Sequence, residues 1–269
     1  MPGPATYAAI AAGGFRRYST YRAATYAGVF TNSVFGCIIC FTYLALWDER
    51  PNLGGWDGQD AVTFVWLGQS LIMTVALFGG GFVDELAHRI RTGDIAVDLY
   101  RPIDLQTWRY AEDLGWAVFH LLGRGVVPTA VGALLFELAW PGRLATWLWF
   151  LASVVLAVTV SFAIRYLIGL TGFWVLDVSG FAIVIGFLQL FCSGMILPLV
   201  AFPDTLETIV RLLPFAALIQ VPGEIFLEKH TGSGLALALA GQLGWAAVLL
   251  GAGRLLSARA TRRLVVQGG

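Results

Sequence analysis

Side chains able to do covalent or metal chemistry are few in this sequence, and they lie far apart. Cys37 and Cys40 have the two-residue spacing of a redox or metal-binding pair, but no second pair and no histidine cluster accompanies them. We therefore expect both to act as small apolar side chains within an apolar run. The three histidines are widely separated in the sequence: His88, His120 and His230.

Nucleophiles and phosphate-binding loops are equally poorly represented. Ser179 and Ser193 each precede a glycine, but neither has a nearby residue that would act as its base. No G-x-x-x-x-G-K-[ST] motif occurs, and the only lysine, Lys229, is not in a glycine-rich loop. We expect no catalytic residue, no metal ligand and no cofactor in this chain, which would not be an enzyme.

The composition indicates the class of protein in which the remaining polar groups are held. Of the 269 residues, 58% are hydrophobic and only 13% are charged, and the mean hydropathy is +0.75. A soluble domain has about 25% charged residues. This composition excludes disorder, a coiled coil and a nucleic-acid binder. The 17 basic and 17 acidic residues cancel, so only the placement of the charges is informative. These figures predict an integral membrane protein.

Apolar runs of roughly 20 residues are long enough to cross a bilayer as helices. The first run has 25 residues, which favours a retained helix over a signal peptide. The run from about 115 to 139 contains Arg124, whose long stem can reach the headgroups. We expect six transmembrane helices in an all-α fold, at Ala23–Trp47, Ala61–Val83, about 115–139, Leu144–Ile164, Val178–Pro203 and Thr231–Gly253.

The placement of cations predicts the orientation. With six spans, 13 of the 17 cations fall on one side, and the positive-inside rule makes that side cytoplasmic. Both termini are then cytoplasmic. The 13 are Arg16, Arg17, Arg22, Arg89, Arg91, Arg101, Arg109, Arg124, Arg165, Arg254, Arg259, Arg262 and Arg263, and the four on the other side are Arg50, Arg143, Arg211 and Lys229.

Three segments between the spans have a character of their own within a single domain, 1–269. Residues 5–22 combine apolar and cationic positions and predict an amphipathic interfacial helix, although a mere charged flank of the first span is an alternative. Residues 84–114 form a charged cytoplasmic loop that keeps apolar positions. Residues 204–230 contain an uncharged, proline-broken run too short to span, which indicates a re-entrant or interfacial segment on the outer face.

Some smaller features carry expectations as well. Arg165 and Asp177 flank a short inner turn and would pair across it. Gly79-Gly80-Gly81 favours close helix packing over a hinge. Mid-span Gln69, Gln189 and Gln242 suit either interhelical hydrogen bonds or a substrate path.

The loop 84–114 carries the most specific pattern. A charged stretch, Glu85-Leu86-Ala87-His88-Arg89-Ile90-Arg91-Thr92, leads to Gly93-Asp94-Ile95 and then to Leu99-Tyr100-Arg101-Pro102. Apolar residues spaced by four and five positions predict short helices lying across a surface, broken at Gly93 and ended by Pro102.

This pattern and the six-span plan resemble the permease subunit of ABC-2-type transporters, the membrane-spanning subunit of bacterial ABC exporters. The Gly-Asp-Ile and Leu-Tyr-Arg-Pro forms are most similar to a bacterial branch whose permeases occur in pairs, so the resemblance implies a heterodimer more than a homodimer. It also implies a multi-pass protein of the bacterial inner membrane, and a hydrophobic or amphipathic cargo for export.

The resemblance further implies that the loop holds a coupling helix seated on a separate ABC ATPase subunit, which would bind the ATP and magnesium. The coupling residues would be Arg89, Ile90, Arg91, Gly93, Asp94, Ile95, Leu99, Arg101 and Pro102. Of these, Ile90, Ile95 and Leu99 would be buried, while Arg89, Arg91, Asp94 and Arg101 would pair with the partner. Two alternatives remain open: an ordinary surface loop at this position, and a membrane enzyme or assembly protein with no ATPase.

Overall fold

The computed structural model describes residues 3–20, 22–79 and 81–261, without the side chain of Arg22. Over these residues the chain is helical and contains no strand, as expected. Gly80 and the tail arginines Arg262 and Arg263 lie outside the described residues. The longer helices are α1 (Pro4–Ser19), α2 (Arg22–Glu49), α3 (Gly58–Thr74), α4 (Phe82–Thr92), α6 (Leu105–His120), α7 (Val126–Leu135), α8 (Leu144–Leu170), α9 (Ser179–Cys192) and α12 (Ser233–Ala260).

Shorter helical pieces connect them. A π-helical turn, η2, joins α6 to α7 without a break. The shorter elements are η1 (Leu53–Gly55), α5 (Ile95–Leu99), η2 (Leu121–Gly125), η3 (Thr171–Phe173), η4 (Leu199–Ala201), α10 (Asp204–Arg211), η5 (Pro214–Ala217) and α11 (Gln220–Phe226).

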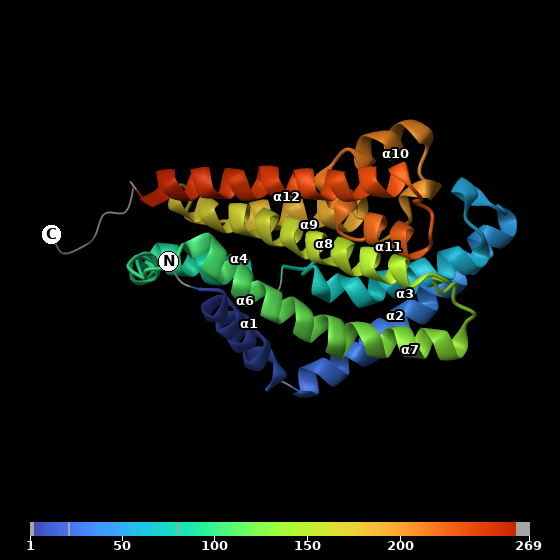
Figure 1. Ribbon diagram of the computed structural model, residues 1–269, viewed down its shortest axis with the longest axis horizontal. Coiled ribbons are helices and arrows are strands. Elements are labelled where there is room, and N and C mark those ends of the chain that lie inside the picture. Colours follow the sequence, from blue (N-terminus) through green and yellow to red (C-terminus); the bar gives the residue numbers. More distant parts are fainter. Residues whose placement is uncertain (1–2, 21, 80, 262–269) are drawn as a thin grey trace.

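The long helices run back and forth along the long axis of the molecule. The start of α1 and the end of α12 lie at the same end as α4, while α10 and α11 lie at the opposite end (Figure 1). The helices α3 and α8 carry more buried residues than any other described helix. α8 packs against α4, α11 and α12, and α3 packs against α2 and α7. Apolar side chains on α2, α9 and α12 remain exposed on the outside, where a bilayer would cover them.

Within the described ranges, four helices are long and apolar enough to cross a membrane: Ala23–Glu49, Leu105–Leu135, Leu144–Phe173 and Ser233–Ala260. The other two expected spans are shorter than the sequence suggested. α3 has 17 residues and α9 has 14. Apolar sequence continues past each helix, but the backbone turns: Ala76 has a φ of 47° and Gly194 a φ of 85°.

The glycines after α3 do not serve close helix packing, which corrects the expectation from the sequence. Gly79 and Gly81 have φ values of 83° and 79°, and nothing lies within 4 Å of where a Cβ would sit. Their role is conformational, because L side chains rarely adopt this backbone region. They let the chain leave α3 and enter α4.

The N-terminal helix α1 packs along the second half of α6. Gly14 and Gly115 allow the two backbones to approach so closely that a Cβ at either position would overlap the other helix. The apolar side of α1 predicted from Tyr7, Ile10 and Phe15 is half-buried, and Phe15 contacts Phe119 of α6 edge to face.

Candidate functional site

The segment from α4 to α6 folds as two short helices at a sharp angle, which we call the elbow (residues 82–102). α4 ends at Gly93, which adopts a φ of 80° and donates its amide to the carbonyl of Ile90 at 3.2 Å. A glycine in the left-handed region is a common helix terminator because it has no Cβ to clash. α5 follows at once, and the chain bends again at Pro102 before Asp104 caps α6 by accepting from the amide of Thr107 at 2.9 Å. The break at Gly93 and the end before Pro102 confirm the predicted local structure.

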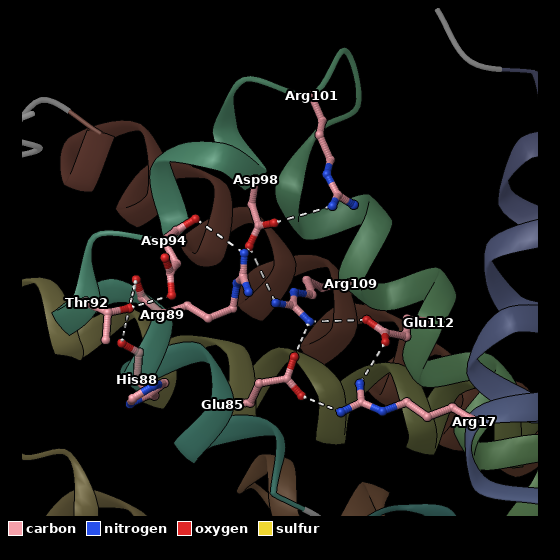
Figure 2. A network of polar contacts seen from close by, with 10 residues as sticks. All are labelled: Arg17, Glu85, His88, Arg89, Thr92, Asp94, Asp98, Arg101, Arg109 and Glu112. Carbon is pink, nitrogen blue, oxygen red and sulfur yellow. Dashed lines mark hydrogen bonds and ion pairs between the residues drawn. The ribbon is translucent and has the colours of Figure 1, made fainter. Parts of the chain in front are cut away.

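A buried carboxylate holds the elbow closed. The side chain of Asp98 on α5 is fully buried, and its Oδ2 lies 2.6 Å from Nε of Arg89 on α4. The same oxygen lies 3.6 Å from Arg109 on α6. A buried charge is tolerated only when it is paired and hydrogen-bonded. Asp98 therefore fixes the angle between α4, α5 and α6 (Figure 2).

Arg109 is the centre of a wider set of ion pairs. Its Nη1 lies 2.9 Å from Glu85 on α4 and 3.2 Å from Glu112 on α6. Arg17 on α1 reaches the same two carboxylates, at 3.1 Å and 3.2 Å. Figure 2 shows these contacts as one connected network from α1 through α6 to the elbow. Four separate helices are thus tied together by charge at one end of the molecule.

The network keeps Glu85 ionised. Partial burial raises the pKa of Glu85, but the hydrogen bond and positive charge of Arg109, together with Arg17, outweigh burial, and the net pKa is lowered. Likewise, the hydrogen bond from Arg89 to Asp98 raises the pKa of Arg89 more than its burial lowers it. Glu85 and Arg89 therefore carry their charges at neutral pH.

Most of the sequence-predicted coupling residues have partners within the chain itself. Arg89 forms an ion pair with Asp98, and Asp94 accepts a hydrogen bond from the hydroxyl of Thr92 at 2.9 Å. Arg91 donates to the carbonyl of Leu176 at 3.2 Å, and Arg101 lies over the ring of Trp108 at 4.3 Å. The same holds for the apolar members, because Ile95 is fully buried in the chain's own core and Ile90 and Leu99 are half-buried against it.

The elbow exposes the expected Arg91, Gly93, Asp94, Arg101 and Pro102, and it also exposes two apolar residues that sequence reasoning missed. Val97 on α5 is 59% exposed, and Tyr100, which directly follows α5, is 83% exposed. Apolar residues on both sides of a short helix are the signal that would have found them, since one side must face away from the core. The elbow thus has an inner surface that fixes its shape and an outer apolar surface without a partner among the described residues.

Behind the elbow, Arg165 pairs with Asp113 and not with Asp177, which corrects the expectation from the sequence. Two parallel hydrogen bonds of 2.9 Å and 2.8 Å join the guanidinium to the carboxylate, and both side chains are buried. Asp177 instead accepts from its neighbour Ser179, which lowers the pKa of Asp177. The pair ties α6 to α8 within the apolar core.

Two cavities lie between the helices. One, of about 570 Å³, is lined by α8, α9, the turn after α3 and the start of α4, including Phe78, Asp84 and Gln189. The other, of about 420 Å³, shares Phe78 and Leu190 with it and reaches α2 at Asn32. Gln189 is 3% exposed, and its Nε2 has no hydrogen-bond partner among the described residues. These cavities are mostly apolar with a few polar groups, as in typical small-molecule sites.

Neither region offers a metal site, since no group of three or more His, Cys, Asp or Glu side chains gathers anywhere in the described ranges.

Comparison with known proteins gives one finding. The family model described as ABC-2 family transporter protein matches residues 33–268, which covers α3 through α12 and most of α2. No curated protein matches this sequence. The permeases of this family are transport subunits of the membrane and generally work with ABC ATPase subunits. Since the match spans most of the chain, this multi-pass membrane protein belongs to the ABC-2 transporter family.

Proposed function

We propose that this chain is the membrane-spanning subunit of an ATP-driven exporter, and that its elbow is the docking joint for a separate ABC ATPase. The observation that carries the proposal is the elbow itself: an outward apolar surface at Val97 and Tyr100 on a segment held rigid by Asp98 and Arg109. ATP and magnesium would bind to the ATPase subunit.

The network supplies a physical route for the motion. A displacement of α5 would be transmitted through Asp98 to Arg89 on α4 and to Arg109 on α6. Arg109 would transmit it further to Glu85 and Glu112, which also pair with Arg17 on α1. α6 continues through η2 into α7 and so runs the length of the molecule. Rigid ties of this kind let a small movement at the docking joint tilt whole helices.

For the membrane arrangement we propose six spans, formed by α2, α3, α6 with α7, α8, α9 and α12, with both termini in the cytoplasm of a bacterial cell's inner membrane. The charge bias supports this orientation. The 17-residue α3 and 14-residue α9 would cross with the help of the irregular segments that follow them, which is tolerated where such backbone is buried in protein. α1 would lie at the cytoplasmic interface, and residues 204–230 on the outer face, within one domain.

We propose a hydrophobic or amphipathic cargo and a second permease as partner, in a heterodimer and not a homodimer. The two adjoining cavities support such a cargo because their lining is mostly apolar. The polar residues are Asp84, Arg165, Ser179 and Gln189 in the larger cavity and Thr31, Asn32 and Gln69 in the other. A free amide on Gln189 would orient a polar group of the cargo.

The first test is a pull-down of the full chain in a gentle detergent, with mass spectrometry of bound proteins. We expect a soluble protein with ATP-binding motifs and a second six-span protein. Recovery of the chain alone, unchanged when ATPase subunits are added, would favour the membrane enzyme or assembly alternative.

The second test uses Val97→Asp and Tyr100→Asp, which place a charge on the outward side of α5. We expect each to reduce the recovered ATPase by about tenfold, since a buried unpaired carboxylate costs well over 1.4 kcal/mol. Leu212→Asp is the matched control, because Leu212 is an exposed apolar residue that follows α10 at the far end of the molecule. Equal ATPase recovery from all three variants would refute docking at the elbow.

A further inference from the structure

A separate cavity of about 260 Å³ lies where α1 meets the start of α2 and packs against the end of α6. Its lining residues are Tyr18, Ala24, Thr25, Phe119, His120 and Arg124. In Figure 1 this is the corner at which the chain leaves α1 and turns into α2. The elbow network does not extend to this corner.

Arg124 is a half-buried cation with no counter-ion among the residues that the structure describes. Its guanidinium lies flat against the backbone of α2 at Gly28, where any Cβ would overlap it. Its Nε is buried and has no hydrogen-bond partner, and no described carboxylate forms an ion pair with it. An uncompensated charge in such a position is costly, so a bound anion would be strongly favoured.

His120 is a second unsatisfied polar group in the same cavity. It is 7% exposed, and its Nδ1 has no partner among the described residues. The ring is held by Trp116 at a centroid distance of 4.2 Å and by Tyr18 at 6.1 Å. His120 precedes Arg124 by four residues, which brings the two side chains to one side of the helix. With its proton on Nδ1, His120 would be a donor beside the cation.

The depth of the cavity matches the headgroup layer. The helical run Leu105–Leu135 has 31 residues, about 46 Å at 1.5 Å per residue, against a hydrocarbon core of about 30 Å. The part before about residue 115 carries the ion pairs of Arg109 and Asp113, so the apolar stretch of about 20 residues that follows is the part that must cross. Arg124 lies about 14 Å beyond the start of that stretch. The cavity itself lies at the joint of α1 and α2, since Ala24 and Thr25 directly follow the start of α2, and the long stem of Arg124 can extend toward this cytoplasmic boundary.

We propose that this cavity binds the phosphate of an anionic phospholipid headgroup. The planar guanidinium of Arg124 would bind two phosphate oxygens, a geometry that suits arginine better than lysine. His120 would donate to a third oxygen. Ala24 and Phe119, which line the cavity, offer the acyl chains an apolar surface. A lipid held here would brace the joint between α1 and α2. The inference does not depend on the proposed transport function.

Native mass spectrometry of the purified full chain in detergent tests the proposal, with phosphatidylglycerol and phosphatidylcholine of matched acyl chains as probes. We expect wild-type protein to retain phosphatidylglycerol in preference to phosphatidylcholine. Arg124→Gln should weaken phosphatidylglycerol binding by about tenfold, and His120→Gln by less, because charge-assisted hydrogen bonds are roughly twice as strong as neutral ones. Arg254→Gln, at an exposed position on α12, is the matched control and should bind as wild type does.

Gly28→Ala provides a second variant should Arg124→Gln fold poorly. Alanine favours the helix, but its Cβ would displace the guanidinium, so we expect lipid retention to fall while the protein elutes normally. Equal retention of phosphatidylglycerol by wild type, Arg124→Gln and Gly28→Ala would overturn the site, as would equal retention of the two lipids by wild type. Displacement of phosphatidylglycerol by millimolar inorganic phosphate would assign the cavity to a free anion and overturn the lipid proposal.

Discussion

The ion pair between Arg165 and Asp113 shows at the residue scale how this chain places charge inside an apolar core. Because both side chains are buried, removal of one leaves the other charge unpaired, which costs about 3–5 kcal/mol. We expect Asp113→Asn to lower the melting temperature markedly in detergent, measured by size-exclusion chromatography after heating. The double variant Asp113→Leu with Arg165→Met should recover much of the loss, since a packed apolar pair replaces the charges.

Asp177→Asn is the control for that comparison, since Asp177 is exposed and bonds only to its neighbour Ser179 among the described residues. The melting temperature of Asp177→Asn should lie within about a degree or two of the wild-type value. If Asp113→Asn behaved like Asp177→Asn, the pair would contribute nothing to the packing of α6 on α8.

Glu224 gives a pH prediction at the same scale. Its burial raises its pKa, but hydrogen bonds from His230 at 2.9 Å, Arg211 at 2.6 Å and Gln220 at 2.8 Å outweigh burial and lower the pKa to about 2. The folded pKa lies below the ordinary 4.5, so the stabilisation is fully present above pH 4.5 and is lost as pH falls toward 2. Its size is about 3 kcal/mol.

The variant Glu224→Gln should therefore be less stable than wild type at pH 7, and the difference should shrink between pH 4.5 and pH 3. Melting curves of both proteins across this range measure it. Glu207, which also pairs with Arg211, at 2.7 Å, remains in both proteins and cancels in the comparison. A difference that is constant with pH would show that Glu224 is not ionised in the folded protein.

At the scale of single elements, the elbow depends on the backbone conformation of Gly93. With φ at 80°, proline is excluded because its ring fixes φ near −65°, whereas asparagine tolerates the left-handed region. We expect Gly93→Pro to lose the elbow and with it the bound ATPase, while Gly93→Asn keeps both. ATPase recovery and membrane insertion of each variant are the measurements. If Gly93→Pro retained the ATPase, the elbow would not be the docking joint.

The elements show which parts of the structure were predictable from sequence. Gly93 and Pro102 act locally, so the break in the elbow and the end of α5 were predicted correctly. Two span ends were not, because the apolar sequence continues through the turns after Thr74 and Cys192. The turn at Gly194 depends on a distant contact, because the backbone amide of Gln220 donates to the carbonyl of Ser193 at 3.0 Å. Sequence periodicity carries no information about such a partner.

The candidate site was predictable in position but not in the role of its residues. The pattern in the loop identified the right segment, yet it assigned Arg89 and Ile95 to a partner protein. The structure uses both within the chain, because Asp98 and the core formed by Leu86, Phe162 and Tyr166 are available to them. Which side chains of an amphipathic segment remain free depends on their tertiary neighbours. The apolar side chains that face outward here are Val97 on α5 and Tyr100, which directly follows α5.

At the scale of the whole molecule, the opposite ends of the helices differ in charge and in structure. The end that carries α4 holds the ion network and the start of α1, while the other holds α10, α11 and the loop after α2 (Figure 1). If the first end is cytoplasmic, a reagent that cannot cross membranes must distinguish the two ends in intact cells. The native cysteines Cys37, Cys40 and Cys192 lie in apolar helices and give the background.

We expect Arg50→Cys and Thr231→Cys to react with an impermeant maleimide from outside, because both positions are exposed in loops at the end opposite α4. His88→Cys and Thr261→Cys, exposed at the α4 end, should react only after the cells are opened. The four positions together count the crossings: Arg50 and His88 flank α3, and Thr231 and Thr261 flank α12. Reaction of His88→Cys from outside would mean that α3, with its 17 residues, does not cross the membrane, whereas reaction of Thr261→Cys alone would place the end of α12 on the outer side.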